Sequence, residues 1–296
     1  AARTIRKKIN QRRNEFIVAQ RDRWPDKSSL PLHVKGDIDL SDASRALDAL
    51  SPDAKPGPVK RFRGGTDEAR RHLSKFVREH LEGYAEARTD PSEPRVSLLS
   101  PYLNYGQISP IEVSARVRKA RGPSNDDKEA FLEELIVRRE LAFNYAWFEP
   151  DYDSFDALPD WARETLSEHA NDSRETTYSR QKLESANTHD PYWNAAMNEM
   201  IATGYMHNYM RMYWGKKILE WSDSPEKAFD IALDLNNKYF LDGRCENSYT
   251  NVAWIFGLHD RAWTERDVFG KIRYISAGGL ERKFDIDAYV DWTNAL

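Results

Sequence analysis

A positively charged side chain lies within an unusually apolar stretch of this chain. Residues 197–221 carry Met, Tyr or Trp at nearly every helical turn, and Arg211 stands among them with His207 and Asn208. A helix that is apolar on all sides is normally buried in a large core. Because an unpaired guanidinium in a low-dielectric interior is costly, Arg211 must face either a carboxylate or an anionic ligand.

Three tryptophans lie in or beside the same stretch. Trp214 and Trp221 are seven residues apart, which is two helical turns, so they share one face, and Trp193 lies just upstream. Indoles in series can pass electrons to a buried redox cofactor. An aromatic core produces the same spacing, so both interpretations stay open.

Two other segments could bind a ligand. The run Ser-Leu-Leu-Ser-Pro-Tyr-Leu at residues 97–103 precedes a predicted helix and offers hydroxyls and backbone N–H groups that can hold phosphate. It has none of the Gly-rich nucleotide spacings, and an ordinary turn made by Ser or Thr explains it equally well. Residues 232–244 end in Asn, Asp and Gly, which form either a helix cap and turn or a pair of ligand contacts.

Helical signals dominate the elements that must position these groups. We expect Thr66 to cap a helix that ends before Asp90, and Ser109-Pro110 and Ser224-Pro225 to begin two more. Residues 126–147 predict another long helix, and the apolar stretch 197–221 reads as a further one. The segment 24–65 is rich in Pro, Gly, Asp and Ser and predicts an irregular linker. No alternating strand pattern is present, so the predicted fold is all-α.

Composition narrows the functional classes. Cys245 is the single cysteine, which excludes an internal disulfide framework and a multi-cysteine metal centre, and we expect no metal. No apolar run approaches the roughly 20 residues that span a bilayer, so we expect an intracellular protein without a membrane partner. The net charge of −4 argues against wholesale nucleic-acid coating. The basic clusters in residues 1–23, 60–63 and 70–71 are either a solvated helix surface or a local DNA contact.

Several motifs resemble those of the photolyase and cryptochrome superfamily, in which a Ser-x-Leu-Ser-Pro-Tyr-Leu run binds flavin phosphate. The stretches Trp-Asn-Ala at 193–195, Met-His-x-Tyr-Met-Arg-Met-Tyr-Trp at 206–214, Lys-Lys-Ile-Leu-Glu-Trp at 216–221 and Phe-Gly-Lys-Ile-Arg-Tyr at 269–274 look like class II cyclobutane pyrimidine dimer photolyases. The resemblance runs from about residue 65 to the C-terminus. It implies a multi-helical FAD-binding catalytic domain at 65–296, preceded by an N-terminal helix and linker segment at 1–64.

The resemblance also implies a flavin site. Asp242 would neutralise Arg211 beside the isoalloxazine ring, and Asn236 would face flavin N5. An electron chain of Trp214, Trp193 and Trp221 would photoreduce the FAD, whose reduced form is the active one. The remaining residues expected to bind FAD are Tyr84, Ser97, Leu98, Leu99, Ser100 and Gly243.

For function, the resemblance implies light-driven repair of pyrimidine dimers flipped out of damaged DNA, by a monomer. Glu134 would hydrogen-bond the flipped bases, Trp254 and Met212 would form apolar walls, and Arg88 would line the same cavity. Glu134 and Arg138 could instead form a plain ion pair at helical i,i+4 spacing.

Relatives carry an α/β antenna domain in front of this region, and no remnant of it is visible in the sequence. We therefore expect either a fragment or a protein that uses light absorbed by FAD alone, without an antenna chromophore. Two alternatives to repair remain. One is a cryptochrome-like light sensor, and the other is a flavin-free DNA-binding or scaffold protein.

Overall fold

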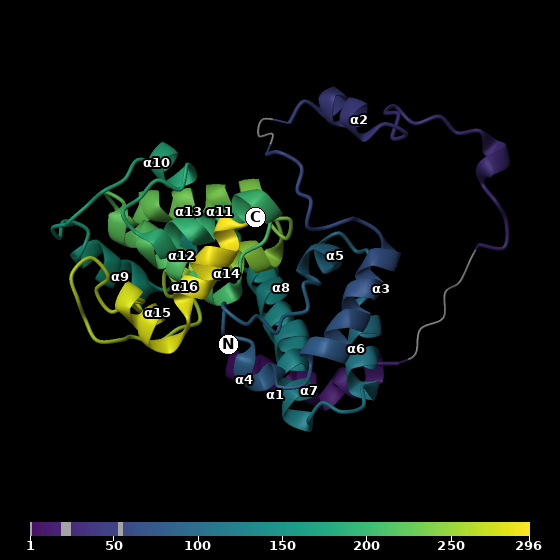
Figure 1. Cartoon of the computed structure of the whole chain (residues 1–296), viewed down its shortest axis with the longest axis horizontal. Helices are drawn as coiled ribbons and strands as arrows, with labels where there is room; N and C mark the ends of the chain where they lie inside the picture. The colour runs from purple at the N-terminus through teal and green to yellow at the C-terminus, as the bar shows by residue number, and fades with distance from the viewer. Residues whose placement is uncertain (1, 19–24, 53–55) are drawn as a thin grey trace.

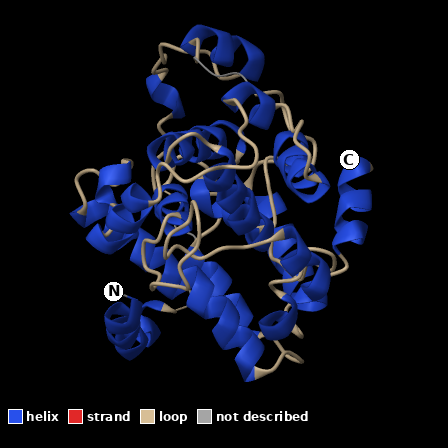
Figure 2. Ribbon diagram, turned by 90° about the vertical axis from the view of Figure 1, so that its left-hand side faces the viewer, coloured by secondary structure: helices blue, strands red, loops and turns tan. Residues whose placement is uncertain are grey.

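The computed structural model describes residues 2–18, 25–52 and 56–296, and every regular element within them is helical (Figure 2). A single isolated antiparallel bridge joins Arg266 to Gly270 in this part of the chain. The predicted all-α fold is therefore confirmed. Residues 19–23 of the basic stretch, and residues 24 and 53–55 of the predicted linker, lie outside the described residues.

The first half of the chain forms a set of mostly short helices. These are α1 (Ala2–Phe16), η1 (Leu30–Leu32), α2 (Ala43–Leu50), α3 (Thr66–Lys75), η2 (Phe76–His80), α4 (Tyr84–Ala87), α5 (Ser100–Asn104), α6 (Pro110–Lys119), α7 (Asn125–Leu132), η3 (Glu133–Arg138) and α8 (Arg139–Phe148). The elements η2 and η3 are π-helical turns inserted into otherwise α-helical runs. The predicted helix over 126–147 is thus one continuous run with a π-helical middle.

The second half contains the longer helices. These are η4 (Phe155–Ala157), α9 (Asp160–Glu168), α10 (Arg180–Glu184), α11 (Pro191–Thr203), α12 (Asn208–Trp221), α13 (Pro225–Tyr239), α14 (Glu246–Ile255), α15 (Ala277–Lys283) and α16 (Ile286–Asn294).

Two of the predicted helix starts are confirmed by their caps. The Ser109 side chain accepts the backbone N–H of Ile111 at 3.2 Å, and proline follows at the first helical position of α6. Ser224 accepts the N–H of Lys227 at 3.3 Å at the start of α13. In each case the side-chain oxygen satisfies a backbone donor that the first turn leaves free.

Three other predictions are corrected. Thr66 is the first residue of α3 rather than its cap, and Gly65 holds the cap position with φ 117°, which disfavours any side chain there. The apolar stretch 197–221 is two helices, because Gly204 ends α11 in the left-handed conformation and His207 caps α12. The linker also contains a regular helix, α2, which Asp42 caps.

The helices are arranged in two lobes, each with its own buried core (Figure 1). The N-terminal lobe comprises α1 and α3 to η3, and its core residues come from α3, η2, α4, α5, α6, α7 and η3 and from the segments between them. The C-terminal lobe comprises α9 to α16 and contains the larger core, built around α11, α12 and α13. Helix α8 joins the lobes and packs on α14, while α2 lies away from both.

Candidate functional site

Arg211 faces a carboxylate in the C-terminal lobe, which is one of the two alternatives that the sequence left open and the one that the resemblance implied. Arg211 Nη2 on α12 donates to both carboxylate oxygens of Asp242, at 2.9 and 3.0 Å. The two side chains are 18% and 14% exposed, so the pair is largely buried but reachable from one side. Phe240 lies beneath the guanidinium, with its ring centroid 3.7 Å from Arg211 Cζ. The pair thus forms a polar site that lies against the ring of Phe240.

The neighbouring His207 does not compete for that carboxylate. Its Nδ1 accepts the backbone N–H of Tyr209 at 3.3 Å and so caps α12. Burial lowers the pKa of His207 to about 4, which keeps the imidazole neutral at physiological pH. Arg211 is therefore the cation that Asp242 faces on this helix.

The loop at 97–100 has the backbone of an unusual turn. Leu98 is held at φ 54°, the left-handed region that a branched side chain rarely adopts. Ser97 Oγ accepts the N–H of Leu99 at 3.4 Å, which is the ordinary turn that the sequence left open. The side chains of Leu99 and Tyr84 are buried in the core of the N-terminal lobe. A ligand could therefore contact only the backbone of Leu99, and only the backbone or the edge of the phenol ring of Tyr84.

Asn104 joins this loop to the charged pair across the lobe boundary. Its Nδ2 donates to the carbonyl of Leu241 at 3.1 Å and to that of Gly243 at 3.4 Å, on either side of Asp242. Two segments that are predicted to bind a ligand, and that are far apart in the sequence, therefore meet in space. Asn104 directly follows the Ser97–Leu103 run, and this adjacency was the only sequence signal for its role.

Asn236 and Gly243 lie at the end of α13 beside the pair. Asn236 is buried, and its Nδ2 donates to Asn237 Oδ1 at 3.0 Å. A Cβ at Gly243 would come within 2.8 Å of the Phe240 carbonyl and 2.9 Å of the Asn236 carbonyl. Glycine is thus required because the chain folds back against the helix end, which places Asp242 opposite Arg211.

A second group of predicted residues gathers where the lobes meet. Glu134 on η3 pairs with Arg88 at 3.1 Å, and both side chains are about one-third exposed. Arg138, four residues on, lies 3.9 Å from Glu133 and stacks over Trp254 of α14, 5.0 Å from the ring centroid. The alternative of a Glu134–Arg138 ion pair is therefore wrong.

Trp254 has a second aromatic partner that the sequence did not indicate. His259 meets the indole edge-on, with centroids 5.7 Å apart, and it adopts φ 61° in the turn that follows α14. Burial lowers the pKa of His259 to about 4. Trp254 is thus held between a cation and a neutral imidazole, while half-buried Met212 packs against the large core.

The three tryptophans are buried in the C-terminal lobe. Trp193 Nε1 donates to the backbone carbonyl of Trp214 at 2.9 Å. The rings of Trp193 and Trp221 meet edge-to-face, with centroids 5.7 Å apart. The residues are 0%, 1% and 3% exposed in the order Trp193, Trp214 and Trp221. Trp193 therefore contacts both of the other tryptophans, Trp221 through its ring and Trp214 through its backbone carbonyl, and these contacts also serve packing.

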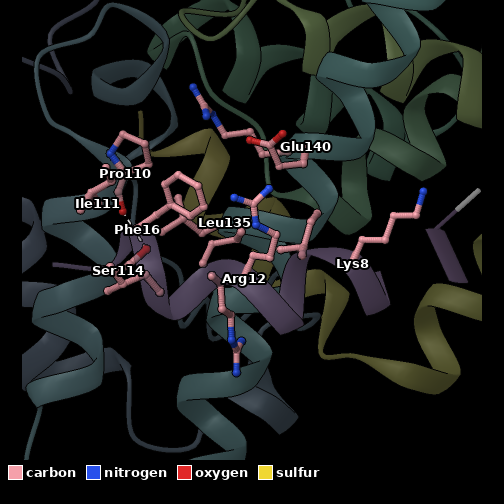
Figure 3. Close-up of a pocket in the computed structure, with 13 residues that line it drawn as sticks. Lys8, Arg12, Phe16, Pro110, Ile111, Ser114, Leu135 and Glu140 are labelled. Atoms are coloured by element: carbon pink, nitrogen blue, oxygen red, sulfur yellow. Dashed lines mark hydrogen bonds between the residues drawn. The ribbon is translucent and has the colours of Figure 1, made fainter. Parts of the chain in front are cut away.

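A cavity of about 510 Å³ lies elsewhere, between α1, the start of α6 and the run from η3 into α8 (Figure 3). Phe16, Ile111 and Leu135 contribute apolar walls, and Arg12 and Arg139 contribute charge. None of the predicted site residues lines this cavity. Within the described ranges, no group of acidic, His or Cys side chains could hold a metal, and no helix is long and apolar enough to cross a membrane.

Two curated relatives match the chain from end to end. A protein named deoxyribodipyrimidine photo-lyase from Methanothermobacter thermautotrophicus is 49% identical over 100% of this chain and 64% of its own length. One with the same name from Arabidopsis thaliana is 40% identical over 100% of this chain and 61% of its own length. The chain thus spans less than two-thirds of either relative. No family model matches the chain.

Solved structures share the fold at lower identity. A bacterial class III photolyase from Agrobacterium tumefaciens superposes with a TM-score of 0.63 at 21% identity, over 92% of this chain and 51% of its own. An archaeal photolyase from Sulfolobus tokodaii, solved with two FAD molecules, gives 0.55 at 20% identity, over 79% of this chain and 47% of its own. These likenesses support the helical architecture described above.

Proposed function

This chain is homologous to proteins named deoxyribodipyrimidine photo-lyase, and on that premise we propose that it splits cyclobutane pyrimidine dimers flipped out of DNA, using light and bound, reduced FAD. The observation that carries the proposal is the Arg211–Asp242 pair and its link through Asn104 to the loop at 97–100. The motifs at 206–214, 216–221 and 269–274 support assignment to class II.

The residues present fit FAD by their chemistry. The site offers a guanidinium–carboxylate pair on an aromatic base, a buried amide at Asn236, and a strained turn with hydroxyls and backbone N–H groups. That combination suits a ligand with a polar ring system at one end and anionic phosphates at the other. We assign the flavin ring to Arg211, Asp242 and Asn236, and the phosphates to the loop at 97–100 and Tyr84.

When bound, the flavin supplies the photoexcited electron that opens the cyclobutane ring and that returns afterwards, so no net redox change results. The chain's own part is to bind and orient the lesion. Glu134 and Arg88 are exposed enough to hydrogen-bond the flipped bases, and Trp254 offers an aromatic face beside them. A dimer pairs poorly in the duplex, which lowers the cost of flipping it.

The buried tryptophans fit a second task. We assign Trp214, Trp193 and Trp221 as the path by which electrons from the surface restore the reduced cofactor. Trp193 contacts the ring of Trp221 and donates to the backbone carbonyl of Trp214, which supports the assignment. Because DNA is the proposed substrate, we place the protein inside the cell. We further propose that it acts as a monomer.

The test is a repair assay on the full chain loaded with reduced FAD. A dimer-containing oligonucleotide should lose its dimers under blue light, while a dark sample keeps them. Glu134→Gln should bind FAD normally and repair slowly. If the protein binds reduced FAD but the dimers are not lost under light, the proposal is overturned. If the flavin is photoreduced efficiently but the protein does not prefer damaged over intact DNA, a cryptochrome-like sensor is the better assignment.

A further inference from the structure

The cavity of about 510 Å³ beside α1 has apolar walls that the described part of the chain leaves partly uncovered (Figure 3). Ile9 and Phe16 of α1 line it together with Ile111 of α6 and Leu135 of η3. The Phe16 side chain is 54% exposed. Small-molecule sites typically have volumes of about 300–1,000 Å³, and covering exposed apolar surface is favourable. The cavity therefore has the size and the walls of a ligand site.

Basic residues flank the apolar stripe of α1 on both sides, and the body of the protein neutralises one side. Arg6 and Arg13 are seven residues apart, so they share one edge of the helix. Arg6 pairs with Glu133 at 2.7 Å, and Arg13 pairs with Glu129 at 2.7 Å. These two ion pairs hold α1 against α7 and η3, and they leave little charge on that edge for a ligand.

The cations on the other side lack such partners. Helical spacing places Lys8 and Arg12, four residues apart, on the opposite edge of the stripe. The carboxylate nearest to Arg12 is Glu15 of the same helix, at 3.3 Å, and both side chains are more than half exposed. Lys8 forms no ion pair with any described residue. Arg139 of α8 is half-buried, and its guanidinium lies over the Phe143 ring, 4.5 Å from the centroid. Three cations are thus available to an anion.

The remaining polar groups of the cavity do not offset this charge. The Ser114 hydroxyl donates to the Pro110 carbonyl at 2.7 Å, so its proton is already used (Figure 3). Glu140 is the one acidic side chain among the described residues that line the cavity, and it is exposed. The basic side chains in the lining are Lys8, Arg12, Arg13 and Arg139. The potential in the cavity is therefore positive and favours an anionic head group.

We propose that this cavity binds an amphipathic carboxylate with an aliphatic chain, of the fatty-acid kind. Its carboxylate accepts charge-assisted hydrogen bonds from Arg139 and lies near the two free cations of α1. Its chain covers Ile111 and Leu135. An aliphatic chain fits better than a flat ring system, because Phe16 is the one aromatic side chain in the described lining and the other apolar walls are branched aliphatic groups or proline.

The cavity shares a helical run with the proposed lesion site but none of its residues. Glu134 and Arg138 belong to the lesion site, and Leu135 and Arg139, each one position further on, line the cavity. Successive helical residues point in different directions, so the two sites lie on different faces of the run from η3 into α8. This inference goes beyond the proposed function and needs neither FAD nor DNA for its test.

Isothermal titration calorimetry of the full chain with dodecanoate, below its micelle concentration, tests the site. We expect saturable binding, and binding more than about tenfold weaker for dodecyltrimethylammonium, which has the same chain and the opposite charge. Arg139→Gln should weaken dodecanoate binding by about tenfold, because a charge-assisted hydrogen bond is lost. Arg118→Gln is the matched control, since Arg118 is exposed on α6 and does not line the cavity.

Two further measurements test the apolar walls. Ile111→Trp should abolish binding, because the indole fills the cavity and removes no charge. A dodecanoate with a terminal diazirine should crosslink to the unmodified chain within residues 8–17, 110–114 or 135–140, and this result decides the matter if a variant fails to fold. Equal affinity for the two amphiphiles, unchanged binding in both variants, or crosslinks outside these ranges would overturn the inference. Loss of repair or of FAD binding would bear on the proposed function alone.

Discussion

The guanidinium of Arg138 stacks over the indole of Trp254, so the π-helical turn of the N-terminal lobe closes on α14 of the C-terminal lobe. Glu134, which pairs with Arg88, lies one turn before Arg138 on the same π-helical segment, and the flipped lesion is proposed to bind between this pair and Trp254. The guanidinium of Arg138 is planar and weakly hydrated, so it can pack on the indole ring and still attract a phosphate group of DNA.

Trp254→Ala should therefore weaken binding of dimer-containing DNA. Aromatic stacking contributes about 1–3 kcal/mol per base, and binding of intact duplex should change little because its bases stay stacked. Fluorescence anisotropy with the two duplexes measures the difference. Trp147→Ala serves as the control, since Trp147 is 83% exposed and contacts no predicted site residue. Equal loss of affinity for both duplexes would contradict a lesion-specific role.

Asp242→Asn should destabilise the fold and prevent FAD retention. The substitution leaves the largely buried Arg211 without a counter-charge, and breaking a buried pair from one side costs about 3–5 kcal/mol, with partial exposure favouring the lower value. Urea unfolding measures the change. The exposed pair of Lys227 and Asp223 gives the control, because Asp223→Asn should change stability by less than about 1 kcal/mol. A stable variant that still holds FAD would remove the central support for the site.

Stability should depend on pH through His169. Hydrogen bonds to Glu265 and Asp172 raise the pKa of His169 above its ordinary value of 6.5. A raised folded-state pKa contributes stability that is complete below pH 6.5 and is lost as the pH rises through the folded value. The free energy of unfolding of the wild type should thus fall as the pH rises from 6.5 through the folded-state pKa of His169. In His169→Gln this decrease should be absent. Identical pH profiles for the two proteins would show that the contact is not formed in solution.

Gly215→Ala should test the close approach of α12 and α14. A Cβ at Gly215 would overlap Ile255 Cδ1, and overpacking of this kind costs about 1–3 kcal/mol. Thermal or urea unfolding should show the loss, and adding Ile255→Val should recover part of it. Gly278→Ala on α15 is the matched control, because its nearest contact would be the end of the flexible Arg282 side chain at 3.4 Å. A neutral Gly215→Ala would mean that the helices are less tightly packed than described.

Much of the architecture could be predicted from the sequence, because the determinants are local. The Ser-Pro starts of α6 and α13 are encoded in two or three adjacent residues, and their caps form as expected. The need of Arg211 for a carboxylate or an anionic ligand likewise follows from one charge in an apolar stretch. The sequence did not predict helix α2, because the Pro, Gly and Ser residues around it indicated an irregular segment. The helix is short, and Asp42 caps its first turn.

Other features depend on contacts between distant parts of the chain. The break at Gly204 and His207 was hidden because apolar residues continue through it, and only packing reveals two helices. Glu134 pairs with Arg88 rather than with Arg138, since α14 brings Trp254 to the arginine.

The sequence by itself determined an all-α chain with a buried cation, a series of tryptophans in an apolar stretch and motifs that resemble a repair flavoprotein. Tertiary structure alone decided that Asn104 joins the loop at 97–100 to the segment that carries Asp242, and that Trp193 contacts both Trp214 and Trp221. Caps and periodicity are set by neighbours along the chain, whereas these contacts exist only once separate helices have packed together.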